Sequence, residues 1–175
     1  MANRAPSPAT RNRFLSIVVP VLLVGVLADQ ATKSWASLRA AEPRLLVPGY
    51  LAAYAVPNPG GLLGLGHERV ATNTACALVG LACAALLVRV ARADRGRSRG
   101  ADYLGVALLL AGILGNTADR LVLGHVRDFL VTWALPTLAF NVADLLLIAG
   151  GVALLAAVAR SRGRGRVRPD LGFTI

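Results

Sequence analysis

Charged residues, cysteine and histidine are all scarce in this chain of 175 residues. Only 16% of its residues are charged, whereas soluble domains have about a quarter. Cys76 and Cys83 are the only cysteines and form no CxxC motif, which excludes a disulfide framework. The two histidines, His67 and His125, belong to no HExxH motif or zinc-like cluster, so the sequence predicts neither a metal site nor another cofactor.

Apolar residues are abundant and lie in long runs. They make up 55% of the chain, and mean hydropathy is +0.60. A helix that crosses a bilayer needs about 20 mostly apolar residues. Four segments qualify, at about 14–34, 70–91, 102–121 and 139–159. We therefore predict one integral-membrane domain over residues 1–175, an all-α bundle of four transmembrane helices followed by a basic tail at 160–175.

The basic residues predict the orientation of these four spans. Thirteen of the 19 Lys and Arg residues fall before span one, from the end of span two to the beginning of span three, or after span four. This side carries the whole net charge of +10, because acids balance bases on the other side. The positive-inside rule places both termini in the cytoplasm and the connections at about 35–69 and 122–138 outside. The arginine-rich tail is interpreted as a topology signal that contacts anionic lipid, and no nucleic-acid partner is predicted.

The first outward connection is rich in proline and glycine, including Pro48 and Gly49. Between these turn formers lie two short apolar runs, Leu45–Val47 and Tyr50–Val56. This pattern predicts short strands and turns that lie on the outer end of the bundle.

Polar residues inside the spans fall at one depth. Asp29, Asn116 and Asp144 each lie five residues from the outer end of their predicted span, about 7 Å below the boundary. Residues three or four apart on a helix share a face. This spacing groups further polar residues with the first three: Lys33 with Asp29, Asp119 and Arg120 with Asn116, and Asn141 with Asp144.

Two interpretations of this polar layer follow from the residues alone. One is structural, with amides joining the helices and local ion pairs at Asp29–Lys33 and Asp119–Arg120. The other is catalytic, because ionisable groups within a span often mark a functional site. No serine or cysteine nucleophile stands beside a histidine, so carboxylates are the available groups. Two neighbouring carboxylates share a proton, and one can then activate water while the other polarises a carbonyl, as in aspartic proteases.

Five short motifs, in order, resemble those of the lipoprotein signal peptidases, also called signal peptidase II. The resemblance covers residues 14–159, which is most of the chain. The motifs are Asp29-Gln30-Ala31-Thr32-Lys33, Asn58-Pro59-Gly60, Gly115-Asn116-Thr117-Ala118-Asp119-Arg120, Gly124-His125-Val126-Arg127-Asp128-Phe129 and Phe140-Asn141-Val142-Ala143-Asp144.

The resemblance implies both an activity and roles for residues. Asp128 and Asp144 would be the catalytic pair of a membrane aspartic endopeptidase in the bacterial inner membrane. It would cleave diacylglyceryl-modified prolipoproteins just before the lipidated cysteine, near the extracytoplasmic face and in contact with lipid. A monomer is expected, because the bundle completes the site alone. The family fold also implies a small extracytoplasmic β-cradle between the first two helices. Supporting or substrate-binding roles would fall to Asp29, Lys33, Asn58, Gly60, Asn116, Asp119, Arg120 and Asn141.

Three positions depart from the family pattern. Leu63 stands where a phenylalanine is common, Ala111 replaces a glycine, and Arg127 replaces an apolar residue before Asp128. Adjacent side chains point apart in a strand, but an Arg127 that reached Asp128 would favour the ionised carboxylate. Two other functions remain open: a non-catalytic binding module of the same fold, and a small proton-coupled transporter subunit.

Overall fold

The computed structural model describes residues 8–39, 42–59, 78 and 100–164. The predicted second span at 70–91, Gly60 and Leu63 lie outside the described residues, apart from Leu78, which is helical.

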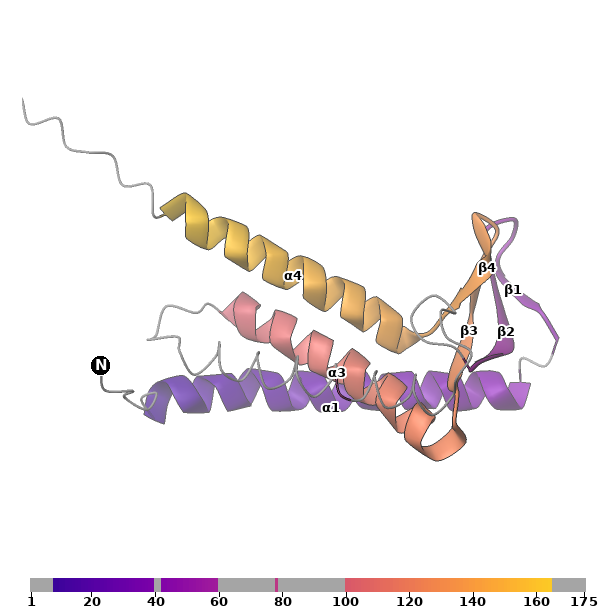
Figure 1. The fold of residues 1–175 in the computed structure, drawn as a ribbon, viewed down its shortest axis with the longest axis horizontal. Helices are drawn as coiled ribbons and strands as arrows, with labels where there is room; N and C mark the ends of the chain where they lie inside the picture. The colour runs from indigo at the N-terminus through magenta and orange to yellow at the C-terminus, as the bar shows by residue number, and fades with distance from the viewer. Residues whose placement is uncertain (1–7, 40–41, 60–77, 79–99, 165–175) are drawn as a thin grey trace, which may run out of the picture.

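In the described part of the chain, three long helices run alongside one another and carry a small sheet at one end (Figure 1). They are α1 (Pro8–Arg39), α3 (Gly100–Leu123) and α4 (Val142–Arg164). Helix α3 packs against both α1 and α4, which touch each other less. These helices contain the predicted first, third and fourth spans, and each extends past its predicted end by a few residues.

The sheet has four antiparallel strands in the order β1-β2-β3-β4. Strands β1 (Arg44–Val47) and β2 (Leu51–Asn58) come from the first connection. Strands β3 (Val126–Thr132) and β4 (Leu135–Phe140) come from the connection between α3 and α4. The two strands predicted in the first connection are therefore confirmed, whereas a sheet confined to that connection is wrong. The described fold is mixed helix and sheet rather than all-α.

Two glycines in the left-handed backbone region position the strands. Gly49 has φ 75° and follows Pro48, and the Tyr50 N–H donates to the Val47 carbonyl at 3.0 Å. Proline followed by such a glycine is the sequence of a type II turn, which joins β1 to β2. Gly124, also at φ 75°, ends α3 two residues before β3 begins.

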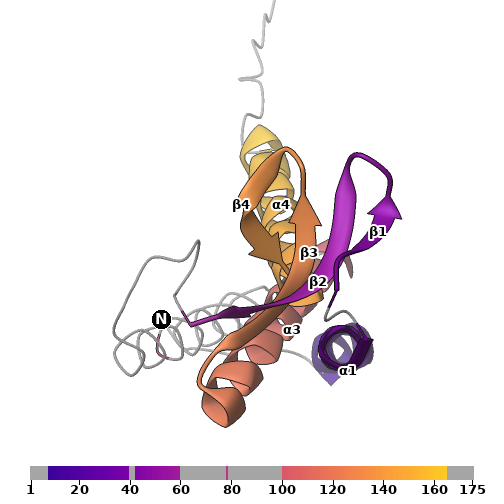
Figure 2. The same ribbon diagram turned by 90° about the vertical axis from the view of Figure 1, so that its right-hand side faces the viewer.

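The sheet covers the ends of the helices on one side (Figure 2). Phe129 of β3 and Ala36 of α1 are buried together, with Trp35, Leu130 and Val142 packed around them. This cluster fixes β3 between the end of α1 and the beginning of α4. A second cluster, toward the other end of the bundle, joins α1 to α3 through Val18, Tyr103 and Ala107.

Small residues bring the helices into close contact. A Cβ atom on Gly112 of α3 would lie 2.5 Å from the Ala143 carbonyl oxygen of α4. A Cβ atom on Gly25 of α1 would lie 2.7 Å from the Cβ of Ala111. Such contacts are typical of helices packed within membranes, where packing rather than the hydrophobic effect drives association.

The outer faces of the helices are apolar. Val24 and Leu27 of α1 are each 66% exposed, and Leu155 of α4 is 72% exposed. Among the described residues, two helical stretches, Asn12–Arg39 and Tyr103–Leu123, are long and apolar enough to cross a membrane, and Val142–Ala157 is shorter. Exposed apolar faces of this size are unusual in soluble monomers and suit contact with lipid.

Candidate active site

Asn141 and Asp144 form a reciprocal cap at the beginning of α4. The Asp144 N–H donates to Asn141 Oδ1 at 3.0 Å, and the Asn141 N–H donates to Asp144 Oδ2 at 3.1 Å. This is the capping-box pattern, in which two otherwise unpaired N–H groups are satisfied by side chains. The fourth helix begins at Val142, not at Ala139 as predicted, so Asp144 lies in its first turn. The cap fixes the Asp144 carboxylate relative to the helix.

Asp128 lies on β3 and faces the same cap. Its side chain is 3% exposed, and each carboxylate oxygen accepts one amide hydrogen. Asn58 Nδ2 donates to Oδ2 at 2.8 Å, and Asn141 Nδ2 donates to Oδ1 at 2.6 Å. Asn58 reaches Asp128 because β2 and β3 pair with Val56 opposite Asp128, which places Asn58 diagonally on the same face.

Lys33 fixes the orientation of the amide that holds Asp144. Lys33 is fully buried, and its Nζ donates to Asn116 Oδ1 at 2.9 Å. Because an ammonium group can only donate, the Asn116 oxygen must face Lys33 and its NH₂ group must face the other way. That NH₂ group donates to Asp144 Oδ1 at 2.9 Å. Asn116 Oδ1 also accepts from Asn141 Nδ2 at 3.1 Å, which joins the two amides.

Asp29 completes the buried network between α1 and α4. Its Oδ2 lies 2.8 Å from Lys33 Nζ, which confirms the predicted ion pair. Its Oδ1 accepts the Ala143 N–H at 2.8 Å and satisfies another free donor at the beginning of α4. Lys33 and Asn116 thus join Asp29 and Asp144, so the polar faces of the three helices meet in one network.

The environment of Asp128 disfavours its charged form. Burial is the main cause and raises the pKa of this carboxyl from 3.8 to about 6, and the nearby Asp144 charge adds to the increase. The hydrogen bond from Asn58 acts in the opposite direction. The Asp128 carboxyl therefore titrates near neutral pH, within the range useful for acid–base chemistry.

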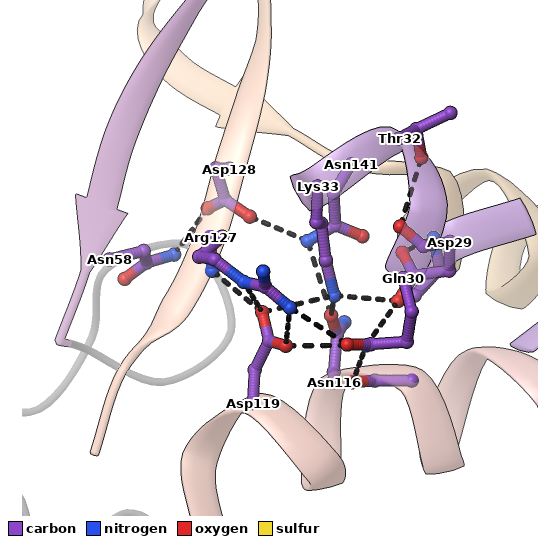
Figure 3. Close-up of polar contacts among 12 residues, drawn as sticks. Asp29, Gln30, Thr32, Lys33, Asn58, Asn116, Asp119, Arg127, Asp128 and Asn141 are labelled. Atoms are coloured by element: carbon purple, nitrogen blue, oxygen red, sulfur yellow. Dashed lines mark hydrogen bonds and ion pairs between the residues drawn. The ribbon is translucent and has the colours of Figure 1, made fainter. Parts of the chain in front are cut away.

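Asp119 binds Arg127 rather than Arg120, so the predicted Asp119–Arg120 pair is wrong. Arg127 Nη2 lies 2.7 Å from Asp119 Oδ1, and Arg127 Nε donates to Oδ2 at 3.2 Å. Arg120 has a buried Nε without a hydrogen-bond partner among the described residues. The reason is geometric, since adjacent residues on a helix point in directions about 100° apart. Arg127 points away from Asp128, as alternation along a strand requires (Figure 3).

Sequence reasoning missed two members of this network, Gln30 and Arg127. Gln30 Nε2 donates to Asp29 Oδ2 at 3.1 Å and to Asp119 Oδ1 at 3.2 Å, and its Oε1 accepts from Arg127 Nη2 at 2.7 Å. The signal for Gln30 was an amide side chain next to Asp29 within an apolar span, since polar groups within apolar helices need partners. Of the ten predicted site residues, Gly60 lies outside the described part of the chain. Within that part, Arg120 forms no hydrogen bond or ion pair with this network, and the other eight are joined by the contacts above.

Comparison with known proteins identifies the family. The family model for signal peptidase (SPase) II matches residues 21–160. A lipoprotein signal peptidase of Bifidobacterium longum is 32% identical and covers 81% of this chain and 77% of its own length. The chain belongs to the signal peptidase II family.

Three further comparisons agree with this membership in signal peptidase II. A lipoprotein signal peptidase of Pseudomonas syringae pv. tomato is 29% identical over 97% of this chain and 100% of its own. A bacterial membrane enzyme solved by the in meso method has a TM-score of 0.77 at 22% identity, covering 89% of this chain and 95% of that one. A second such structure has a TM-score of 0.69. The fold is therefore that of a membrane enzyme, and signal peptidase II is a family of membrane aspartic proteases.

Proposed function

We propose that this chain is an aspartic endopeptidase that removes the signal peptide from diacylglyceryl-modified prolipoproteins, with Asp128 and Asp144 as its catalytic pair. Family membership supports the removal of signal peptides from prolipoproteins. The position of the cut, just before the lipidated cysteine, and the roles of individual residues are our proposals.

The observation that carries the proposal is that one residue, Asn141, donates hydrogen bonds to both carboxyl groups. Asn141 donates to Asp128 Oδ1 from its side chain and to Asp144 Oδ2 from its backbone. One residue thus holds carboxyl groups from a strand and a helix in a fixed relation. Such preorganisation is what two-carboxylate catalysis requires.

The reaction follows from one proton shared by the pair. The ionised carboxylate takes a proton from water, and the resulting hydroxide adds to the scissile carbonyl carbon. The protonated carboxyl donates its proton to the carbonyl oxygen. The tetrahedral intermediate then collapses, the C–N bond breaks and the amine nitrogen receives a proton. The two titrations belong to the pair, so neither carboxyl is assigned a permanent role.

The setting of the pair suits a lipid-modified substrate. The acids lie where the sheet covers the helix ends, and the flanking helix faces are apolar. A diacylglyceryl group anchored in the bilayer would hold its cysteine near the membrane boundary. We place this boundary at the extracytoplasmic face of a bacterial inner membrane, with a multi-pass monomer that contacts lipid and no nucleic acid. Acids gathered in one network favour hydrolysis over a proton path that crosses the membrane.

The direct experiment is cleavage of a diacylglyceryl-modified prolipoprotein by the purified protein and by Asp128→Asn and Asp144→Asn. EDTA is present throughout, so any activity that is observed does not require a free divalent metal ion. We expect the wild type to cut just before the lipidated cysteine. Both variants should lose at least about a thousandfold in kcat while remaining folded, since the amide keeps the size of the carboxyl.

An unlipidated prolipoprotein serves as the matched control substrate. Turnover near the wild-type rate in either variant would contradict the assignment of the pair. An inactive but well-folded wild type that still binds the lipidated precursor would instead favour the binding-module function.

A further inference from the structure

Arg127 bonds to residues from two helices while it lies beside Asp128 on β3. Its guanidinium group contacts both Asp119 oxygens, Gln30 Oε1 at 2.7 Å and Ser34 Oγ at 3.3 Å. The Arg127 backbone N–H also donates to Asp119 Oδ2 at 3.0 Å. The side chain is 21% exposed, whereas that of Asp119 is 1% exposed. A single carboxylate therefore fixes both the backbone and the side chain of the residue before Asp128.

This attachment lies where the sheet holds β3 along one edge only. Strand β4 pairs only with the far part of β3, at Leu130, Val131 and Thr132. On the other side, β2 pairs with this part of β3, and the Arg127 N–H points away from β2 to Asp119. The contacts to Asp119 and Gln30 therefore hold the edge of β3 that β4 does not reach, at the beginning of the strand that carries Asp128.

Arg127 also balances the charge of the buried cluster. Asp29 and Asp119 are the acids of this cluster, and Lys33 and Arg127 are the bases with which they pair. Lys33 Nζ lies 2.8 Å from Asp29 and 3.5 Å from Asp119, so its contact with Asp119 is the longer one. Without Arg127, one ammonium group would have to serve both carboxylates.

Loss of Arg127 would disturb Asp144 and Asp128 through Lys33. Lys33 would move toward Asp119, because an unpaired buried carboxylate attracts the nearest cation strongly. Its hydrogen bond to Asn116 Oδ1, at 2.9 Å, would weaken. Asn116 would then be free to rotate, although its amide holds Asp144 and also contacts Asn141.

We propose that Arg127 is a positioning residue that holds Asp128 and Asp144 in their reactive arrangement. It neutralises Asp119, which keeps Lys33 bound to Asn116, and it attaches β3 to the helices. The inference rests on the proposed function, since the reaction is the one that the carboxyl pair performs. It does not follow from the family pattern, in which an apolar residue is usual at this position. Figure 3 shows the path from Arg127 through Asp119 and Lys33 to Asn116.

The test compares Arg127→Met, Arg127→Lys and the control Arg44→Met in the full-length protein with the lipidated prolipoprotein substrate. Arg44 is an exposed arginine on β1, and its replacement removes the same charge without touching the cluster. We expect Arg127→Met to lower kcat of the folded protein about tenfold to a hundredfold with KM within about twofold, because small displacements of reacting groups reduce rates by such factors. Arg127→Lys should recover part of the loss, and so should adding Asp119→Asn to Arg127→Met, which removes the unpaired charge.

A purely structural role would lower the melting temperature of Arg127→Met and leave kcat of the folded fraction unchanged, and this result would overturn the proposal. An equal loss in Arg44→Met would overturn it as well. Hydrogen exchange over residues 126–132 provides a readout that needs no activity. Faster exchange in Arg127→Met than in Arg44→Met is expected, and unchanged exchange would refute the attachment of β3. A failure of the proposed function would be recognised separately, because the wild type would then not cleave the lipidated prolipoprotein or Asp128→Asn would cleave it at the normal rate.

Discussion

At the scale of single residues, Asn141 combines two roles that substitutions can separate. Its Oδ1 caps α4, and its Nδ2 holds Asp128 and Asn116. Serine retains an acceptor for the cap but lacks the amide hydrogens. Asn141→Ser should therefore lose about tenfold or more in kcat, and Asn141→Ala should in addition lose about 1 kcal/mol of stability. Kinetics and thermal unfolding in detergent measure the two effects. Wild-type turnover in the serine variant would show that the amide is dispensable.

The raised pKa of Asp128 predicts how stability depends on pH. A carboxyl whose pKa is raised from 3.8 to about 6 binds more protons in the folded state than in the unfolded state over that interval. Its contribution is therefore favourable at low pH and is lost as pH rises through about 6, at a cost on the order of 3 kcal/mol by pH 7.

Asp128→Asn removes this titration, so the stability of the variant relative to wild type should increase between about pH 4 and pH 7 and then level off. Melting temperatures of both proteins across this range provide the test. A difference that stays constant with pH would mean that Asp128 keeps an ordinary pKa.

Local spacing decided which contacts could be predicted at this scale. Asp29 and Lys33 are one helical turn apart, and their pairing followed directly from the sequence. Asp119 and Arg127 lie on opposite sides of the Gly124 turn, on a helix and a strand. Their contact depends on the direction in which β3 leaves that turn, and this direction is set by packing on α1.

At the scale of helices and strands, Gly115 shows how closely α1 and α3 approach at the site. A Cβ atom there would lie 2.5 Å from Asp29 Oδ2, and Asp29 is fully buried. Gly115→Ala should displace the Asp29 carboxylate from Lys33 and Ala143, and lower stability by about 1–3 kcal/mol as in other overpacked sites. Activity should fall with it.

Gly151 of α4 provides a matched control, because nothing lies within 4 Å of a Cβ atom added there. Gly151→Ala should be neutral or stabilise the helix by up to about 1 kcal/mol. Unfolding midpoints of the two variants measure the contrast. Equal effects of the two substitutions would mean that the close approach at Gly115 does not constrain the site.

Hydropathy predicted the described helices well and their outer ends poorly. The apolar residues Leu138, Ala139 and Phe140 lead directly up to Asn141, so hydropathy included the end of β4 in the predicted span. The spacing of Asn141 and Asp144 is the signal that marks the beginning of the helix. Strands β1 and β2 were recognised because Pro48 and Gly49 punctuate them. The pairing of β2 with β3 joins segments about 70 residues apart, as in the contact of Asn58 with Asp128, and only the folded chain brings them together.

At the scale of the whole molecule, the distribution of charge predicts the orientation in the membrane. The candidate pair lies at the end of the bundle where α1 ends and α4 begins. The arginines of residues 160–168 begin within the other end of α4, which includes Arg160, Arg162 and Arg164. Because the excess of basic residues favours the cytoplasm, the sheet and the pair should face outward.

Single cysteines test this orientation in a chain whose Cys76 and Cys83 are replaced by alanine. Ala134→Cys lies at the exposed turn between β3 and β4. A membrane-impermeant maleimide should label it in intact spheroplasts, whereas a cysteine added after Ile175 should react only after the membrane is permeabilised. Retained cleavage of the prolipoprotein shows that each variant is folded. The reverse labelling pattern would place the carboxyl pair on the cytoplasmic side. A lipidated cysteine in the outer leaflet could then not reach Asp128 and Asp144, and the proposed substrate would have to be abandoned together with the topology.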